Sequence, residues 1–314
     1  MQTACIERAP SILSITFFIM NISQNSKTYL IISIGLVSIS TASLLIRWAE
    51  EVPTLIIAAY RLSVAALILA GISMKQKSIL YDLSNHKELL LTLAAGVALS
   101  LHFIFWIESL RLTSVASSVV LVLTSPIWTA VISHFFLKET LEPNQIYGIL
   151  VAIIGVSLIA FSGTAVGSSA SEGNLLALLG GVMAGIYLSL GRILRRNKGV
   201  IAYSGSVYLT AAVILVLMAV ISGRELTGYS FNMYILLLMI GIIPQLLGHT
   251  SFNWALKHSS AVSVSVLMLG EPVGATLLAA LFLREIPSGG ELFGGGILLI
   301  GIYLSTKQIR GENV

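Results

Sequence analysis

Charged side chains are scarce in this sequence. Asp, Glu, Lys and Arg make up 10% of its 314 residues, and 56% of the residues are hydrophobic. A soluble domain carries about 25% charged residues, so a soluble globular protein is excluded. The mean hydropathy is +0.94. A chain this apolar is expected to cross lipid as helices, which satisfy their own backbone hydrogen bonds. The composition therefore predicts an all-α, polytopic membrane protein.

Cysteine and catalytic motifs are scarce as well. Cys5 is the single cysteine, which excludes an intramolecular disulfide and a thiolate metal cluster. The sequence has no G-x-x-x-x-G-K-[ST] motif, no H-E-x-x-H motif and no metal-ligand spacing among its five histidines. No basic face suggests nucleic acid as a partner, and nothing indicates the oligomeric state. We therefore expect no enzymatic activity, no cofactor and no bound metal.

Stretches long enough to cross a bilayer, which takes about 20 residues, recur ten times. The breaks between them carry proline, glycine or charge, and the longest Gly/Ser-rich break follows the fifth stretch. The predicted spans are 29–48, 53–73, 88–110, 114–137, 144–162, 174–194, 201–222, 232–256, 260–283 and 291–306.

The spans divide the chain into two five-helix units, 29–162 and 174–306, joined by a linker at 163–173. Residues 307–314 form a tail. Residues 1–28 are interpreted as a cytoplasmic or interfacial segment, because their apolar patch is too short to span. A signal peptide is the alternative, but no small-x-small cleavage site follows the patch. Met20 is an alternative start, which leaves open whether residues 1–19 belong to the native protein.

Two segments of the chain repeat one pattern at a fixed offset of 146 residues. Residues 111–141 read RLTSVASSVVLVLTSPIWTAVISHFFLKETL, and residues 257–287 read KHSSAVSVSVLMLGEPVGATLLAALFLREIP. Matched apolar residues mean little in an apolar chain, whereas matched proline, glycine and glutamate indicate a duplication. The informative pairs are Ser114 and Ser260, Ser117 and Ser263, Pro126 and Pro272, Glu139 and Glu285, Gly148 and Gly294, and Gly155 and Gly301.

The distribution of Lys and Arg predicts the orientation, because cytoplasmic loops collect these residues. With the N-terminus inside, thirteen fall on the inner side and four on the outer side, so both termini are expected in the cytoplasm. Five spans per unit is an odd number, so the second unit would cross the membrane upside down. Such inverted repeats let transporters alternate access to one midplane site. The outer set is Arg47, Arg111, Arg224 and Arg284, and the inner set is Arg8, Lys27, Lys75, Lys77, Lys87, Lys138, Arg192, Arg195, Arg196, Lys198, Lys257, Lys307 and Arg310.

The doubled pattern resembles the drug/metabolite transporter superfamily, EamA type. The resemblance rests on SVASSVVLVLTSPIWTAVISHFFLKE and SVSVLMLGEPVGATLLAALFLREIPS, on Tyr60-Arg61, and on the glycines of spans five and ten. It covers about residues 29–306. It implies a ten-helix carrier, typically an exporter of amino acids or other small metabolites in the plasma (inner) membrane of a prokaryote. It does not imply one substrate, because members of the family differ in what they move.

Glu271 is the first candidate for the substrate or proton pathway. A carboxylate in mid-span costs roughly 2.5–3.5 kcal/mol on insertion scales, and the following Pro272 disrupts the helix and frees backbone carbonyls. The structural alternative is that Ser, Asn or His neighbours hold Glu271 and only lock helices together. Its repeat mate is Ser125, followed by Pro126, so the two units differ chemically at their centres.

Polar stripes on two other spans are predicted to face the interior, since lipid offers them no partner. Gln245, His249 and Asn253 follow one another at four-residue spacing, and His102 and Trp106 share a face of the third span. They would form cavity walls or, alternatively, hydrogen bonds between helices. Trp106 and Trp254 lie near span ends, where interfacial tryptophans are common, so we expect them at the interface.

Arg61 lies deep in the second span, where it would meet a carboxylate substrate or pair with Glu108. The helix-locking interpretation is favoured. Glu139 and Glu285 mark the repeat and are expected to anchor loops. The small-residue pairs Gly181 and Gly185, and Gly270 and Gly274, are interpreted as packing contacts that let helices approach closely.

These patterns together predict a secondary active transporter, an exporter of small metabolites such as amino acids. The bilayer surrounds it, and protons are the candidate coupling ion through Glu271. Multidrug efflux and flipping of a lipid-linked substrate share the architecture and stay open. An intramembrane enzyme would need a catalytic cluster at one membrane face, and a channel would lack saturable counterflow.

Overall fold

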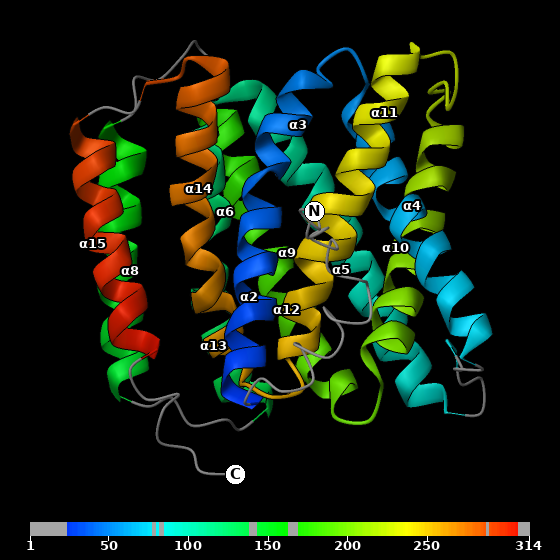
Figure 1. The fold of residues 1–314 in the computed structure, drawn as a ribbon, viewed down its shortest axis with the longest axis horizontal. Helices are drawn as coiled ribbons and strands as arrows, with labels where there is room; N and C mark the ends of the chain where they lie inside the picture. Colours follow the sequence, from blue (N-terminus) through cyan, green and yellow to red (C-terminus); the bar gives the residue numbers. More distant parts are fainter. Residues whose placement is uncertain are drawn as a thin grey trace, which may run out of the picture.

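The computed structural model describes residues 24–76, 80–81, 85–137, 143–162, 169–286 and 289–306. Within these ranges the chain is helical with short turns and contains no strand, which confirms the all-α prediction for the described part. Residues 1–23, 163–168 and 307–314 lie outside it, and with them most of both predicted tails and half of the predicted linker. The helices run side by side along one direction (Figure 1).

The element order follows the hydropathy of the sequence closely. In chain order the helices are α2 (Gln24–Ser40), α3 (Ala42–Trp48), α4 (Thr54–Lys75), α5 (His86–Leu112), α6 (Val115–Val122), α7 (Ser125–Ile132), η1 (Ser133–Leu137), α8 (Pro143–Ser162), α9 (Ala170–Arg195), α10 (Val200–Ile221), α11 (Phe231–Ile240), η2 (Gly241–His249), α12 (Thr250–Ala255), α13 (Ala261–Leu267), η3 (Met268–Gly270), α14 (Glu271–Leu278), η4 (Ala279–Leu283) and α15 (Gly289–Thr306).

Eight helical stretches of the described chain are long and apolar enough to cross a membrane. They coincide with eight of the ten predicted spans. The other two predicted spans, 144–162 and 291–306, coincide with α8 and α15, whose apolar parts Pro143–Gly155 and Leu292–Gly301 are shorter. The eight stretches are Thr28–Trp48, Thr54–Lys75, His86–Leu112, Val115–Phe136, Ser171–Arg195, Val200–Ile221, Phe231–Ala255 and Ala261–Leu283.

The stretches Val115–Phe136 and Ala261–Leu283 are broken helices with the same sequence of local structures. Ser114 caps α6 and Ser260 caps α13, each accepting a hydrogen bond at 3.1 Å from the backbone N–H three residues on. This is the cap that serine provides at a helix N-terminus. The first α-helix of each stretch ends one turn before the proline, and Pro126 and Pro272 lie in the first turn of α7 and α14. Proline fits there because it has no N–H to leave unpaired.

Both broken helices also end in a π-helical turn, η1 and η4, at residues 133–137 and 279–283. These positions differ by the same 146 residues as the sequence repeat. The matched serines thus have a structural role as caps, and the matched prolines start the second helical segment. Both broken helices end in the same wide turn. Both breaks fall near the middle of their stretch.

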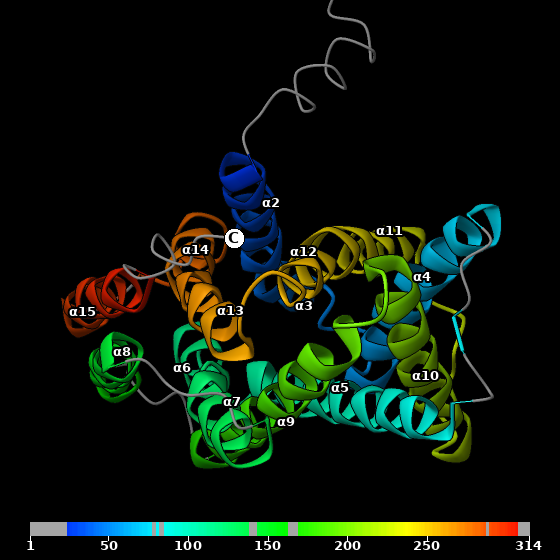
Figure 2. The same cartoon turned by 90° about the horizontal axis from the view of Figure 1, so that it is seen from below.

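The helices form two facing rows when viewed along their axes (Figure 2). One row contains α15, α14, α2 and α12, and the other contains α8, α7, α9 and α5. At one end of the rows α8 packs against α15 with close backbone contact. A Cβ added at Gly155 would lie 2.5 Å from the backbone N of Leu298, and one added at Gly301 would lie 2.5 Å from the backbone N of Ala152. Only glycine permits this approach without displacing backbone.

Contacts at the ends of the two broken helices reveal their directions. Arg47, at the end of α3, contacts both Thr113, just before α6, and Glu285, just after η4. At the other end of the bundle Gln145, near the start of α8, donates to Ser263 in α13 at 2.9 Å. One broken helix therefore starts where the other ends, and the two run in opposite directions.

Candidate functional site

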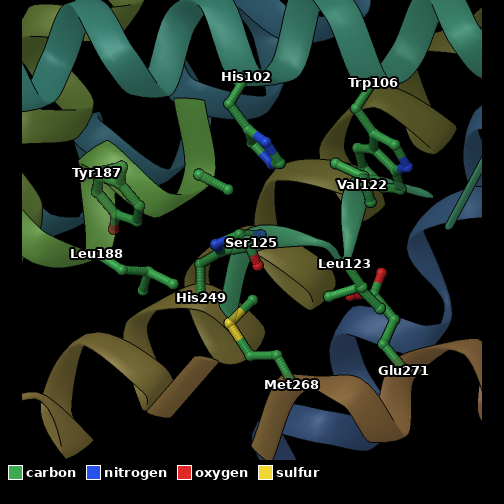
Figure 3. Close-up of a pocket in the computed structure, with 11 residues that line it drawn as sticks. His102, Trp106, Val122, Leu123, Ser125, Tyr187, Leu188, His249, Met268 and Glu271 are labelled. Atoms are coloured by element: carbon green, nitrogen blue, oxygen red, sulfur yellow. The ribbon is translucent and has the colours of Figure 1, made fainter. Parts of the chain in front are cut away.

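A small cavity lies between the two rows of helices. Both helix breaks contribute to its wall, so it lies near the middle of the spans. In Figure 3, His102 and Trp106 come from α5 on one side, and Met268 and Glu271 come from the opposite side. The full lining is His102, Trp106, Val122, Leu123, Ser125, Ala184, Tyr187, Leu188, His249, Met268 and Glu271.

Glu271 and Ser125 occupy matched places on this wall. Each directly precedes the proline at the start of its second helical segment, which places both side chains at a helix break. Glu271 is 7% exposed and forms no hydrogen bond or ion pair with any residue that the structure describes. Its carboxylate therefore borders the cavity without a hydrogen-bonded partner, and Arg61 interacts with it electrostatically. A membrane-embedded carboxylate in such a place is a functional-site candidate by default.

The predicted histidines both reach the cavity, and their rings lie 6.3 Å apart between centroids. His102 is fixed through Nδ1, which lies 2.9 Å from the backbone O of Gly180. Trp106 stacks on His102 with an interplanar angle of 9° and is 3% exposed. The expectation that Trp106 sits at the membrane interface is wrong, because its ring is buried on the cavity wall.

Gln245 and Asn253 do not line the cavity. Gln245 accepts a hydrogen bond from Arg61 Nε at 2.7 Å. Asn253 accepts from Tyr187 at 2.6 Å and donates to Ser204 and Tyr208. The expected stripe fails because residues 241–249 form a π-helix, so four-residue spacing no longer returns to one face. Only His249 of the three borders the cavity.

Arg61 is fully buried and does not pair with Glu108. The Glu108 carboxylate instead accepts a hydrogen bond from Thr54. The guanidinium carbon of Arg61 lies 4.1 Å from the centroid of the Phe103 ring. The predicted Arg61–Glu108 pair is therefore wrong, and Arg61 is held from the second unit through Gln245.

The glycine pairs lie at close crossings of the spans. A Cβ at Gly181 would lie 2.7 Å from Thr124 Oγ1, and one at Gly185 would lie 2.6 Å from the Trp128 Cβ. On the other side of the cavity Gly270 and Gly274 approach Leu36 and Ser40 of α2 in the same way. Thus each broken helix crosses a helix of the other predicted five-helix unit at glycine.

Of the two repeat-marking glutamates, Glu285 lies 3.5 Å from Arg47, which joins the end of η4 to the end of α3. Glu139 lies outside the described residues. Arg284, just before Glu285, adopts a left-handed backbone with φ of 60°, the conformation that ends helices most often at glycine.

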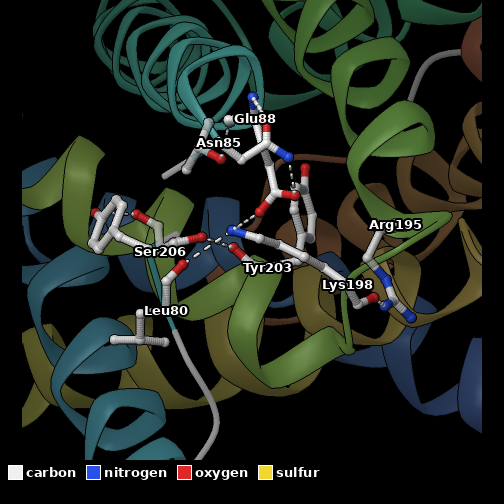
Figure 4. A network of polar contacts seen from close by, with 9 residues as sticks. Leu80, Asn85, Glu88, Arg195, Lys198, Tyr203 and Ser206 are labelled. Atoms are coloured by element: carbon white, nitrogen blue, oxygen red, sulfur yellow. Dashed lines mark hydrogen bonds and ion pairs between the residues drawn. The ribbon is translucent and has the colours of Figure 1, made fainter. Parts of the chain in front are cut away.

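The end of the bundle opposite Arg47 carries a network of charged and polar contacts (Figure 4). Lys198 Nζ lies 2.9 Å from Glu88 and donates to the backbone O of Leu80 at 3.0 Å. Arg195 donates to the backbone O of Asn253, which ties α9 to α12. Nearby, burial and the charges of Arg195, Lys257 and Arg192 lower the pKa of His258 below its ordinary value. Cations therefore dominate this end.

Tyr187, Leu188 and Met268 line the cavity although no sequence pattern singled them out. Leu188 and Met268 carry no signal in an apolar span. Tyr187 is the exception, because a tyrosine in mid-span requires a hydroxyl partner, and here Asn253 supplies it. Tyr187 thus links the cavity wall to the polar residues of α10 and α12.

The fold and the cavity define the class: a helical, multi-spanning membrane protein with a small polar site between two broken helices. The chain belongs to the EamA-like transporter family, within the drug/metabolite transporter superfamily, because the family model matches residues 26–161 and again residues 171–307. The two matches fall on the two predicted units.

Relatives and a solved structure agree with this assignment. An uncharacterized transporter of Clostridium kluyveri is 26% identical over 207 residues, 64% of this chain and 66% of that protein. A probable terminal-alkyne amino-acid exporter of Streptantibioticus cattleyicolor is 25% identical over 201 residues, 61% of this chain and 64% of that protein. The matches thus span just under two thirds of both relatives. A protein of known crystal structure shares the fold with a TM-score of 0.73 and 18% identity, covering 92% of this chain and 99% of its own.

Proposed function

We propose that this chain is a secondary active carrier that exports small metabolites such as amino acids by alternating access to the cavity at Glu271. The observation that carries the proposal is a cavity between two oppositely directed broken helices, bordered by the Glu271 carboxylate, which forms no hydrogen bond or ion pair with its described neighbours. In this proposal the membrane is the plasma (inner) membrane of a prokaryote, with both termini in the cytoplasm.

Three observations support two inverted five-helix units as the moving parts. The family model matches twice. The broken helices run in opposite directions, as judged from Arg47 and Gln145. The α8–α15 contact is also symmetric under exchange of the units, because Gly155 against Gly294 corresponds to Gly301 against Gly148. Two such halves would be related by an axis in the membrane plane. If they exchange conformations, the site opens first to one side of the membrane and then to the other.

Amino acids are the favoured substrate class for two reasons. A relative in the same family bears the name of an amino-acid exporter. The cavity wall combines polar groups, among them Glu271, Ser125 and two histidines, with apolar surface from Leu123, Leu188 and Met268. A molecule with a charged end and an apolar side chain would meet both kinds of surface.

Proton coupling through Glu271, assisted by His249 or His102, follows from the same site. A carboxylate, two imidazoles and the phenol of Tyr187 are the titratable groups on this wall, and carboxylates and imidazoles form proton pathways in transporters. Proton binding to Glu271 would neutralise the cavity and change its affinity for a charged substrate. In this scheme one side of the membrane loads a proton, and the other side releases it in exchange for the metabolite.

Reconstituted protein tests the coupling. A thermal-shift screen of the purified carrier against the standard amino acids first identifies a stabilising compound, because a ligand of the folded state raises the melting temperature with concentration. The radiolabelled compound is then followed in proteoliposomes at several pH values. We expect Glu271→Gln to retain counterflow, which needs only exchange, and to lose uphill transport driven by a pH gradient.

Glu172→Gln is the matched control, because Glu172 is exposed at the start of α9. It should retain both counterflow and gradient-driven transport. If Glu271→Gln keeps full, pH-dependent accumulation, Glu271 is not the coupling residue. If the wild type shows no saturable counterflow with any stabilising compound, the carrier function itself is refuted.

A further inference from the structure

Arg61 lacks the partners that a buried cation requires. Its side chain is 0% exposed. Nε donates to Gln245 Oε1 at 2.7 Å, but Nη1 and Nη2 have no hydrogen-bond partner among the described residues. No carboxylate that the structure describes forms an ion pair with it. Glu271 interacts with Arg61 electrostatically but does not bond to it, and a buried ion without a bonded counter-ion is strongly disfavoured.

Two further buried donors near Arg61 lack a hydrogen-bond partner among the described residues. Gln245 Nε2 and Trp106 Nε1 are also buried and unpartnered within the described chain. The guanidinium carbon of Arg61 lies 4.1 Å from the Phe103 ring centroid and 5.5 Å from that of Trp106. The donor cluster therefore has four unpartnered nitrogens, two from Arg61 and one each from Gln245 and Trp106. Gln245 Oε1 already binds Arg61, and Glu271 interacts with Arg61 electrostatically without a hydrogen bond.

Electrostatics and shape indicate what would complete this cluster. Stacking on aromatic faces offsets part of the cost of the buried charge. The remaining donors need an anion that can accept several hydrogen bonds. A carboxylate suits a guanidinium best, because its two oxygens accept parallel hydrogen bonds from the two terminal nitrogens.

Trp106 connects the donor cluster to the cavity. Its ring lines the cavity wall and stacks on His102, while its Nε1 belongs to the cluster. Arg61 and Gln245 do not line the cavity themselves, so a ligand there reaches Arg61 when the Trp106 side chain moves. Glu271 borders the same cavity from α14 and interacts electrostatically with Arg61 without forming an ion pair.

We propose that Arg61, Gln245 and Trp106 form an anion subsite that binds the carboxylate of the transported molecule. This inference rests on the proposed carrier function and deepens it, since it restricts the substrates to carboxylates. Gln245 is a positioning residue: its Oε1 fixes Nε of Arg61 and so directs Nη1 and Nη2 toward the bound group. Phe103 supports the plane of the guanidinium from one face.

The test compares acids with isosteric amides. Each standard amino acid and its C-terminal amide, together with chloride, is titrated against the purified full-length protein by thermal shift and calorimetry. We expect stabilisation by at least one free acid and none by its amide. Arg61→Gln should weaken that acid's binding roughly 100-fold, because two charge-assisted hydrogen bonds are lost. Arg224→Gln, on an exposed loop, should bind as the wild type does.

Gln245→Glu gives a second test that retains Arg61. The new carboxylate would neutralise the guanidinium internally, so acid binding should fall while the melting temperature of the unliganded protein holds or rises. A merely structural role for Gln245 would instead lower the melting temperature and leave the acid-to-amide preference intact. Reduced binding by Arg61→Gln with an unchanged unliganded melting temperature excludes misfolding as the cause.

The remaining outcomes overturn the subsite. Equal stabilisation by chloride and by the acid would identify an inorganic anion site. Equal binding of acid and amide, or no binding of any acid, would refute a carboxylate subsite. If Arg61→Gln keeps saturable counterflow with an unchanged preference for acids, the subsite is refuted and the carrier function stands. If the wild type shows no counterflow, the carrier function is refuted.

Discussion

The two broken helices share a backbone and differ in chemistry. Each begins at a capping serine, breaks before a proline and ends in a π-helical turn at matched positions. At the residue before the proline, however, one has Ser125 and the other has Glu271. Duplication preserved the elements that shape the helix, and the charge exists in one copy. The departures from the repeat are therefore the better guide to chemistry, and the matched residues are the better guide to architecture.

The donor cluster follows the same rule. At the repeat offset the counterpart of Gln245 is Leu99, and the counterpart of Arg61 is Val207. No second cationic cluster of this kind can therefore exist at the matched place. The cavity is framed by symmetric helices and carries asymmetric charges.

Moving the carboxylate between the copies tests this asymmetry and should have the largest effect. Glu271→Ser should reduce gradient-driven transport at least 100-fold, since the titratable carboxylate is lost. We expect the double variant Ser125→Glu with Glu271→Ser not to recover it, because Gln245 and Arg61 have no counterparts on the other side. The measurement is pH-gradient-driven uptake in proteoliposomes. Recovery to near the wild-type rate would show that the two breaks are chemically interchangeable.

The glycine contact between α8 and α15 should lose about the same stability whichever of its two glycines is replaced. Gly155→Ala and Gly301→Ala each place a methyl group 2.5 Å from a backbone nitrogen, and overpacking of this kind costs about 1–3 kcal/mol. Both should lower the melting temperature by similar amounts. Gly296→Ala is the control on α15, because nothing lies within 4 Å of a Cβ built there. Unequal losses for the two glycines would contradict a symmetric contact.

Replacing Arg47 or Arg192 should have the smallest effect of these changes. The two replacements should shift access to the cavity toward opposite sides of the membrane. Arg47 donates to the backbone O of Thr113 at 3.0 Å, and Arg192 donates to that of Leu256 at 2.8 Å, at opposite ends of the bundle. Each joins the end of its unit's first span to the loop before the broken helix. Replacing Arg47 with Gln removes its contacts to Thr113 and Glu285, and replacing Arg192 removes its contacts to Leu256 and Lys257. Each loss falls at one end of the bundle and should shift a two-state equilibrium several-fold.

Labelling from the two sides of the membrane measures that shift. In a Cys5→Ser background, Ser125→Cys reports access to the cavity. Arg47→Gln should increase labelling from the side of Arg47, and Arg192→Gln should increase it from the opposite side. The same change in both variants would mean that the two contacts do not hold alternate ends closed.

Much of the architecture could be predicted because hydropathy and proline act locally. The spans follow from apolar length, and the breaks at Pro126 and Pro272 follow from the missing N–H of proline. The position of each polar side chain within the bundle was harder to predict from the sequence. Asn253 was expected at the cavity and instead bonds to Tyr187, Ser204 and Tyr208, because the π-helical turn before it changes which face it presents. Trp106 looked interfacial from its place in the span but lies on the cavity wall.

The sequence by itself determined that this chain is helical and membrane-embedded, that it is a duplication, and that a carboxylate stands at one of two proline breaks. Those properties depend on composition and on neighbours along the chain. Only the tertiary structure decided which polar groups share the cavity and which bind one another instead, as Gln245 binds Arg61. Hydrogen-bond partners of a buried polar group lie on other helices, up to 184 residues away along the chain, and no local pattern records the rotation of one helix against the next.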